Sequence, residues 1–200
     1  LIRKAEKIVR QEGMSDQIEL QQGDIHQLPF EDAAFEWVWS SSCVGYASSI
    51  DPYTALQEFT RVVQPGGTIA ILAWSSEKLL PGYPLLEASL NATASGLAPF
   101  GAEGNPERHF MRALGWFRHA GLRNISAQTF IGDVQAPLNK EMRQALIALF
   151  EMRWENVEPE LNEDQRSTYQ RICLPESNDF IVDHPDYYAF FTYTLFTGYA

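Results

Sequence analysis

The apolar run at residues 68–74, with the sequence TIAILAW, is the feature that most constrains the fold. A strand with one face in water alternates apolar and polar residues, and this run does not alternate. Continuous apolar runs are typical of parallel strands that helices cover on both faces. The run is also far too short to cross a bilayer. We therefore expect an α/β domain with this strand near its centre.

The segment before this run has the signals of a helix. Asp51 is a favourable N-cap residue, and Pro52 suits the first helical position. Leu56 and Phe59 follow at helical spacing, and the Pro-Gly-Gly turn at residues 65–67 ends the pattern. The sequence predicts a helix over about residues 52–63, followed at once by the buried strand.

Two further strands are predicted at residues 18–22, which alternate, and at about residues 35–41. Gly23 ends the first, so Asp24 stands at its carboxyl end, and residues 28–30 (LPF) form a stiff elbow. In open α/β sheets, ligands bind just outside the carboxyl ends of the strands. Asp24 and the serines at 40–42 occupy two such ends.

The other apolar patterns predict helices and strands along the rest of the chain. Helices are expected at residues 1–11, around 85–90, at 107–119, at 139–154 and after Asn162, and strands at 125–130 and 187–196.

These motifs, taken in order, resemble the class I S-adenosylmethionine (SAM)-dependent methyltransferases of the small-molecule type. The resemblance rests on GD at 23–24, LPF at 28–30, FEWV at 35–38 and ExxRVVQPGG at 58–67. It covers about the first third of the chain. Glu36 and Gln64 depart mildly from the usual Asp and Lys of the family.

The resemblance implies a Rossmann-like sheet of strand order 3-2-1-4-5-7-6, with strand 7 antiparallel. Strands 1 and 2 and the glycine-rich loop would be missing from this chain. We expect residues 1–200 to be a single, N-terminally incomplete domain with cap-like helical insertions at about 77–104 and 135–186. The helix at 1–11 lacks an N-cap, and the strand at 18–22 would lack sheet neighbours, so we expect the fragment to be neither self-sufficient nor active alone.

The resemblance also assigns cofactor-binding residues. Asp24 would accept the amino hydrogens of adenine, Ile25 would offer its amide and pack on the ring, and Ser41 would touch SAM through its backbone. Tyr46 could contact the sulfonium through a cation–π interaction. The alternatives are a turn-forming Asp24 and a small-residue loop that only allows close chain approach.

Methyl transfer requires orientation above all, and a general base only where the acceptor must lose a proton. His26, His109 and His184 are the candidates, although a lone histidine is more often structural. No His/Cys cluster has zinc spacing, so we expect no metal. Two cysteines among 200 residues indicate a reducing, cytoplasmic location.

The net charge of −11 argues against nucleic-acid binding, because phosphate neutralisation needs a basic surface. The favoured function is SAM-dependent methyl transfer to a small molecule, with the insertions choosing the acceptor. A non-catalytic Rossmann-like domain that has lost SAM binding is the alternative, and a nicotinamide-dependent oxidoreductase fits less well. Quinone, amine, polyketide and carboxylate acceptors remain open, as does a homodimer. The acid-rich residues 151–186 could attract a cation, but a solvated surface explains them better.

Overall fold

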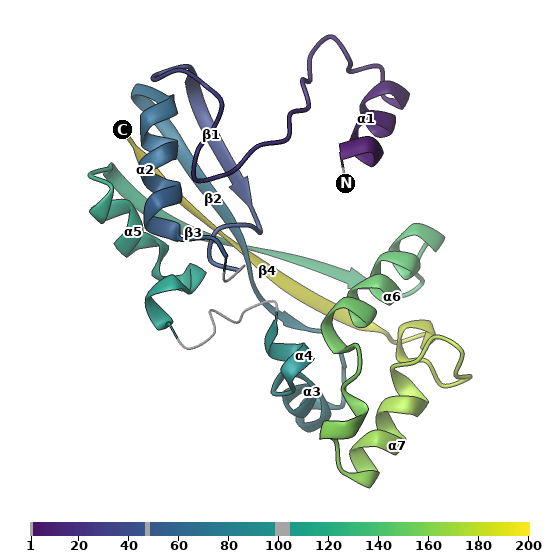
Figure 1. The fold of residues 1–200 in the computed structure, drawn as a ribbon. Helices are drawn as coiled ribbons and strands as arrows, with labels where there is room; N and C mark the ends of the chain where they lie inside the picture. The colour runs from purple at the N-terminus through teal and green to yellow at the C-terminus, as the bar shows by residue number, and fades with distance from the viewer. Residues whose placement is uncertain (1, 47–48, 99–104) are drawn as a thin grey trace.

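The computed structural model describes residues 2–46, 49–98 and 105–200. It contains a four-stranded mixed sheet in the order β1-β2-β4-β3 (Figure 1). β1 pairs in parallel with β2, and β4 is antiparallel to both β2 and β3. This is the order expected for strands 4, 5, 7 and 6 of the resembled family. The strands are β1 (Phe35–Ser41), β2 (Val63–Lys78), β3 (Arg123–Gln135) and β4 (Tyr188–Tyr199).

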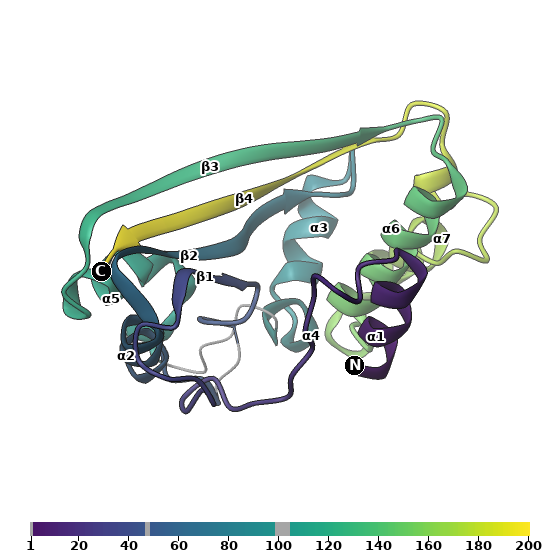
Figure 2. The same cartoon turned by 90° about the horizontal axis from the view of Figure 1, so that it is seen from above.

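The prediction of a strand at residues 18–22 is wrong. These residues join no ladder, and the one bridge nearby, between Asp24 and Gln27, is a local turn. The segment runs outside the sheet before it reaches β1 (Figure 2). Four of its five residues are exposed, so water can satisfy the backbone groups that a neighbouring strand would otherwise have paired.

The first hydrophobic core lies between the sheet and the helices α2 (Pro52–Val62) and α5 (Ala113–His119). The predicted cap of α2 is confirmed: Asp51 Oδ2 accepts a hydrogen bond from the Thr54 amide at 2.9 Å. From the strands, the core takes Ile69, Ile71, Ala73 and Phe196; from the helices and the segments beside them, it takes Ala55, Leu56, Phe59, Phe110, Ala113, Trp116 and Phe117.

The second core lies at the other end of the long strands. Its helices are α3 (Pro84–Asn91), α4 (Ala94–Leu97), α6 (Lys140–Trp154) and α7 (Glu163–Ile172), all within the two insertions expected from the sequence. Asn139 and Asn162 cap α6 and α7, and Gln165 completes a capping box in α7. The buried members include Leu79, Leu86, Leu90, Val134, Leu146, Phe150, Trp154, Ile172, Phe180 and Tyr187.

A β-bulge in β2 lies between the part of the strand in the first core and the part in the second. Residues 74 and 76 of β2 pair with the adjacent residues 193 and 192 of β4, so Ser75 is the extra residue. On β4, Phe196 packs in the first core and Ala189 in the second, and residues an odd number apart point to opposite faces. The two helix groups therefore use opposite faces of β4. Both lie below the sheet in Figure 2, because the long strands twist.

The helix expected at residues 107–119 is only partly confirmed. Two short 3-10 turns, Pro106–Arg108 and Phe110–Arg112, precede α5. His109 between them is extended, with φ −71° and ψ 135°, and its ring Nδ1 accepts a hydrogen bond from the Met111 amide at 3.3 Å. The imidazole thus caps a new turn and interrupts a continuous α-helix.

The remaining predicted elements form, but several differ in length. β2, β3 and β4 are longer than their apolar runs, and α2 ends at Val62 because β2 already begins at the next residue. α1 (Ile2–Gln11) forms as expected but buries no side chain. Across the described ranges, no helix is both long and apolar enough to span a membrane.

Candidate functional site

β1 ends beside the middle of the parallel strand β2, which continues to Lys78. Ser41 at the end of β1 is exposed and pairs with Leu72. Ser42 then turns the chain with a positive φ of 46°, and its amide donates to Leu72 O at 2.9 Å. Ser40, in contrast, is buried, with its hydroxyl turned away from solvent. Of these serines, Ser41 is the exposed residue at the end of β1, where a ligand could reach its backbone.

Asp24 presents an exposed carboxylate whose side chain is 68% accessible. Its Oδ1 accepts hydrogen bonds from the His26 amide at 2.9 Å and from His26 Nδ1 at 3.0 Å. These bonds, the backbone one above all, lower the pKa of Asp24. Both bonds involve Oδ1, so Oδ2 of this exposed side chain is available to a ligand.

His26 connects this turn to helix α2. The Asp51 amide donates to His26 Nε2 at 3.0 Å, so Nε2 is an acceptor and the ring hydrogen sits on Nδ1. Both ring nitrogens of His26 are thus engaged in hydrogen bonds, so the residue is a structural link and not an open general base. Ile25 is half-buried and packs against the first core, which leaves part of its side chain for a ligand.

The ExxR and LPF motifs hold each other in place. Glu58 accepts a hydrogen bond from the Leu28 amide at 2.8 Å. Arg61 donates to Phe30 O at 2.8 Å and to Leu28 O at 3.1 Å, and pairs with Glu58 at 2.6 Å. The side chains from α2 thereby fix the elbow that follows the Asp24 turn. Sequence reasoning noted both motifs but did not foresee that they bind each other.

Tyr46 lies beside β2, with its hydroxyl donating to Trp74 O at 2.6 Å. Its ring stacks on Phe110, with centroids 5.1 Å apart. Gly45 makes this approach possible: it has a φ of +89°, and a Cβ there would lie 2.7 Å from Phe110 Cα. Burial raises the pKa of Tyr46, and the nearby Tyr193 and Glu77 add to the rise. The phenol is therefore a neutral hydrogen-bond donor.

The other two histidines make local bonds. His109 caps the turn described above, and His184 Nδ1 accepts from the Asp186 amide at 3.1 Å. Within the described part of the chain, no group of three or more His, Cys, Asp or Glu side chains could hold a metal ion.

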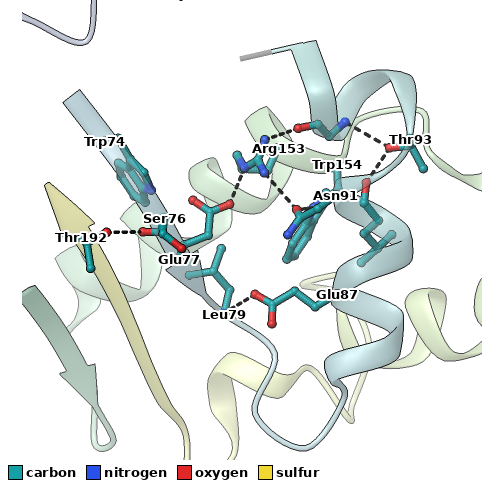
Figure 3. A network of polar contacts seen from close by, with 12 residues as sticks. Trp74, Ser76, Glu77, Leu79, Glu87, Asn91, Thr93, Arg153, Trp154 and Thr192 are labelled. Carbon is teal, nitrogen blue, oxygen red and sulfur yellow. Dashed lines mark hydrogen bonds and ion pairs between the residues drawn. The ribbon is translucent and has the colours of Figure 1, made fainter. Parts of the chain in front are cut away.

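A buried polar network, which sequence reasoning missed, lies between β2 and the insertion helices (Figure 3). Arg153 donates to Glu77 Oε1 at 2.5 Å, and the two side chains are only 3% and 4% exposed. Arg153 also donates to Gly96 O at 2.6 Å and to Asn91 Oδ1 at 2.9 Å, and Trp154 Nε1 donates to the same amide oxygen. The signal in the sequence was an arginine on the apolar side of α6, since Arg153 follows the buried Phe150.

The bulky residues expected to line a substrate cap have mixed positions. Leu86, Phe150 and Trp154 are buried in the second core, where they pack the insertion helices together. Tyr83 is partly buried beside them, and Leu85 is 83% exposed. Phe100 lies outside the described residues. Packing therefore accounts for the first three.

Comparisons with known proteins agree with the fold. Residues 1–71 match the family described as "Methyltransferase domain". The demethylmenaquinone methyltransferase of Bacillus pumilus is 33% identical over 138 residues, which is 62% of this chain and 57% of that protein. The enzyme of the same name from Bacillus subtilis is 32% identical over 146 residues, which is 66% and 60%.

A solved structure supports the fold alone. It is that of a candidate methyltransferase from Bacillus halodurans C-125, which superposes with a TM-score of 0.51 at 15% identity and covers 99% of this chain and 78% of that one. The aligned parts of this chain thus span less than two thirds of the two curated relatives. These matches show that the chain is homologous to the demethylmenaquinone methyltransferases and that residues 1–71 match the methyltransferase domain, in line with the class I SAM-dependent methyltransferases of the small-molecule type that its motifs resemble.

Proposed function

We propose that the protein containing this chain transfers a methyl group from SAM to a small-molecule acceptor. The observation that carries the proposal is the exposed Asp24 carboxylate, which His26 fixes in a turn that it also ties to the N-terminus of α2. A preorganised carboxylate in this place suits the exocyclic amine of adenine, because charge-assisted hydrogen bonds are stronger than neutral ones. In this assignment β1, β2, β3 and β4 are strands 4, 5, 6 and 7 of the family's seven-stranded sheet.

The remaining cofactor contacts come from residues near this carboxylate. Ile25 would place its half-buried side chain on the adenine ring and offer its amide to a ring nitrogen. Ser41, exposed at the end of β1, would contact the cofactor through its backbone. SAM supplies the electrophilic methyl group, and the protein has to orient an acceptor in line with it.

The two insertions, at about residues 77–104 and 135–186, would form a cap over the acceptor. Their helices enclose the second core, at the far end of β2 from the PGG turn (Figure 1). Closure over this end would exclude water from the transfer, during which the sulfonium loses its charge. Among the acceptors left open by the sequence, a quinone-type compound is favoured because two of the related enzymes are named demethylmenaquinone methyltransferases.

Isothermal titration of SAM into the full-length protein tests this proposal. Asp24→Ala should weaken SAM binding roughly tenfold or more, because a hydrogen bond to a charged group is lost. The melting temperature should stay the same, since the side chain is exposed. Asp16→Ala, which removes another exposed carboxylate of the N-terminal segment, is the matched control and should leave both values unchanged.

Two outcomes would count against the proposal in different ways. Equal SAM affinity of the wild type and Asp24→Ala would remove Asp24 from the cofactor site. A well-folded wild-type protein without measurable SAM affinity would favour the alternative function, a Rossmann-like binding domain without catalysis.

A further inference from the structure

Two polar atoms in the network of Figure 3 are buried without a hydrogen-bond partner among the described residues. They are the indole Nε1 of Trp74 and the Oε2 of Glu77. Glu77 as a whole is 6% exposed. Buried polar groups are nearly always paired in folded proteins, so an unpaired donor and an unpaired acceptor in one place need an explanation. The two side chains come from the same strand, on either side of the bulge, and Figure 3 shows the indole beside the Glu77 carboxylate.

Glu77 cannot easily turn to satisfy this second oxygen. Its Oε1 is held by Arg153 Nε at 2.5 Å. Arg153 is itself fixed by Gly96 O at 2.6 Å and by Asn91 Oδ1 at 2.9 Å. The ion pair holds the Glu77 carboxylate in one orientation, with Oε2 on the Trp74 side of the network.

Aromatic rings pack next to these two atoms. The Trp74 ring lies 5.3 Å from Phe191 and 5.4 Å from Tyr193, centroid to centroid. Tyr46 approaches from the β1 side, where its hydroxyl binds Trp74 O at 2.6 Å. Trp74 comes two residues after Leu72, which pairs with Ser41. The aromatic group therefore begins next to the end of β1, where the proposed SAM site lies.

The donor and the acceptor together favour a group that can both donate and accept a hydrogen bond. An ammonium could donate to Glu77 but could not accept from the indole. A carboxylate or phosphate could accept from the indole but would be repelled by Glu77. A ketone or an ether could only accept. A hydroxyl group satisfies both atoms, because it donates one hydrogen and accepts another.

We propose that Trp74 Nε1 and Glu77 Oε2 bind a hydroxyl group of an aromatic acceptor, with Trp74, Phe191 and Tyr193 against its ring. The site would recognise a phenol or a hydroquinone and reject its ethers. This inference rests on the proposed function for the role of the ligand as methyl acceptor. The binding of the hydroxyl itself does not require SAM.

Titration of two probes into the full-length protein without SAM tests the site. 1-Naphthol can donate and accept, whereas 1-methoxynaphthalene can only accept. The wild type should bind 1-naphthol roughly tenfold more tightly, as expected for one hydrogen bond to a charged carboxylate. Trp74→Phe keeps an aromatic ring but removes the N–H, and it should weaken 1-naphthol binding several-fold without lowering the melting temperature.

Trp154→Phe is the matched control. Its indole N–H already donates to Asn91 Oδ1 at 2.9 Å, so this variant should melt at a lower temperature and keep the preference for 1-naphthol. Equal affinity of the wild type for the two probes would overturn the proposal, and so would an unchanged affinity of Trp74→Phe for 1-naphthol. If the preference holds while SAM does not bind, the hydroxyl site stands and only the methyltransferase function fails.

Discussion

His26 donates two hydrogen bonds to Asp24 Oδ1, one from its ring Nδ1 at 3.0 Å and one from its backbone amide at 2.9 Å. The opposite ring nitrogen accepts from the Asp51 amide at 3.0 Å. One imidazole ring therefore joins the proposed adenine-binding turn to the N-cap of α2. The carboxylate that would read adenine is held by the first core through this ring.

Two substitutions at position 26 separate the side-chain contact with Asp24 from the contact with the Asp51 amide. In His26→Asn the side-chain amide can still donate to Asp24, whereas in His26→Gln the longer side chain can still accept from Asp51. We expect His26→Asn to bind SAM nearly as well as the wild type and His26→Gln to lose roughly two- to tenfold, the range for one hydrogen bond. Isothermal titration measures both, and identical losses in the two variants would contradict a role for the Asp24 contact.

Glu87 should make the protein less stable at neutral pH than in mild acid. The side chain is 2% exposed, and burial raises its pKa above the ordinary value although the Leu79 amide donates to it at 2.7 Å. A carboxyl whose pKa is higher in the folded state stabilises fully below its unfolded pKa, and this contribution is lost as the pH rises through the folded pKa. Glu87→Gln should therefore melt a few degrees higher than the wild type at pH 7–8 and close to it near pH 4.

Glu151→Gln on the exposed side of α6 is the control for the Glu87 variant. Its melting temperature should follow the wild type at every pH. A Glu87→Gln variant that is less stable than the wild type at pH 8 would show that the ionised carboxylate is stabilising, opposite to this prediction.

The Glu77–Arg153 pair should be far more sensitive to substitution than an exposed pair. Glu77→Gln leaves the guanidinium of Arg153 buried, at 3% exposure, without its counter-charge, and we expect a loss of about 3–5 kcal/mol in the free energy of unfolding. Asp183→Asn breaks the Arg143–Asp183 pair, whose side chains are 35% and 46% exposed, and should cost less than about 1 kcal/mol. Urea denaturation compares the two, and similar losses would refute the distinction.

Gly45 and Gly82 make a matched pair, because both have positive φ, +89° and +86°. Alanine at Gly82 meets no atom within 4 Å and should cost only the backbone strain, about 1–2 kcal/mol. Alanine at Gly45 would also place its Cβ 2.7 Å from Phe110 Cα, which adds about 1–3 kcal/mol of overpacking. Thermal melts should rank Gly45→Ala well below Gly82→Ala, and the reverse order would contradict the close approach of Gly45 to Phe110.

Local signals in the sequence predicted the elements that depend on local chemistry. Asp51 and Pro52 start α2, and the apolar run at 68–74 lies in the middle of β2. Residues 18–22 alternate like a strand but form none. A strand also needs a neighbouring strand to pair with, and the alternation of side chains does not show whether such a neighbour is present.

The chemistry of the site was harder to predict than the fold. Asp24 could be proposed as a cofactor ligand because it belongs to a recognisable motif, and the structure places it exposed beside His26. The Glu77–Arg153 pair could not be predicted: Arg153 stands out on the apolar side of α6, but its partner is 76 residues away and nothing in the sequence points to Glu77. Contacts of this kind depend on how α6 packs against β2, which no short motif encodes.

The bulge at Ser75 reverses the alternation of side chains between the two faces of β2. Ile71 and Glu77 are an even number of residues apart and would point to the same face of a regular strand, yet one lies in each core. Ser75 takes up the extra residue, and its hydroxyl contacts Thr192 Oγ1 at 2.9 Å and receives a hydrogen bond from Thr194 at 2.9 Å. The face to which the side chains of β2 point thus switches at a single serine. Because of this switch Glu77 points toward Arg153, while Ile71 packs with α2 in the first core.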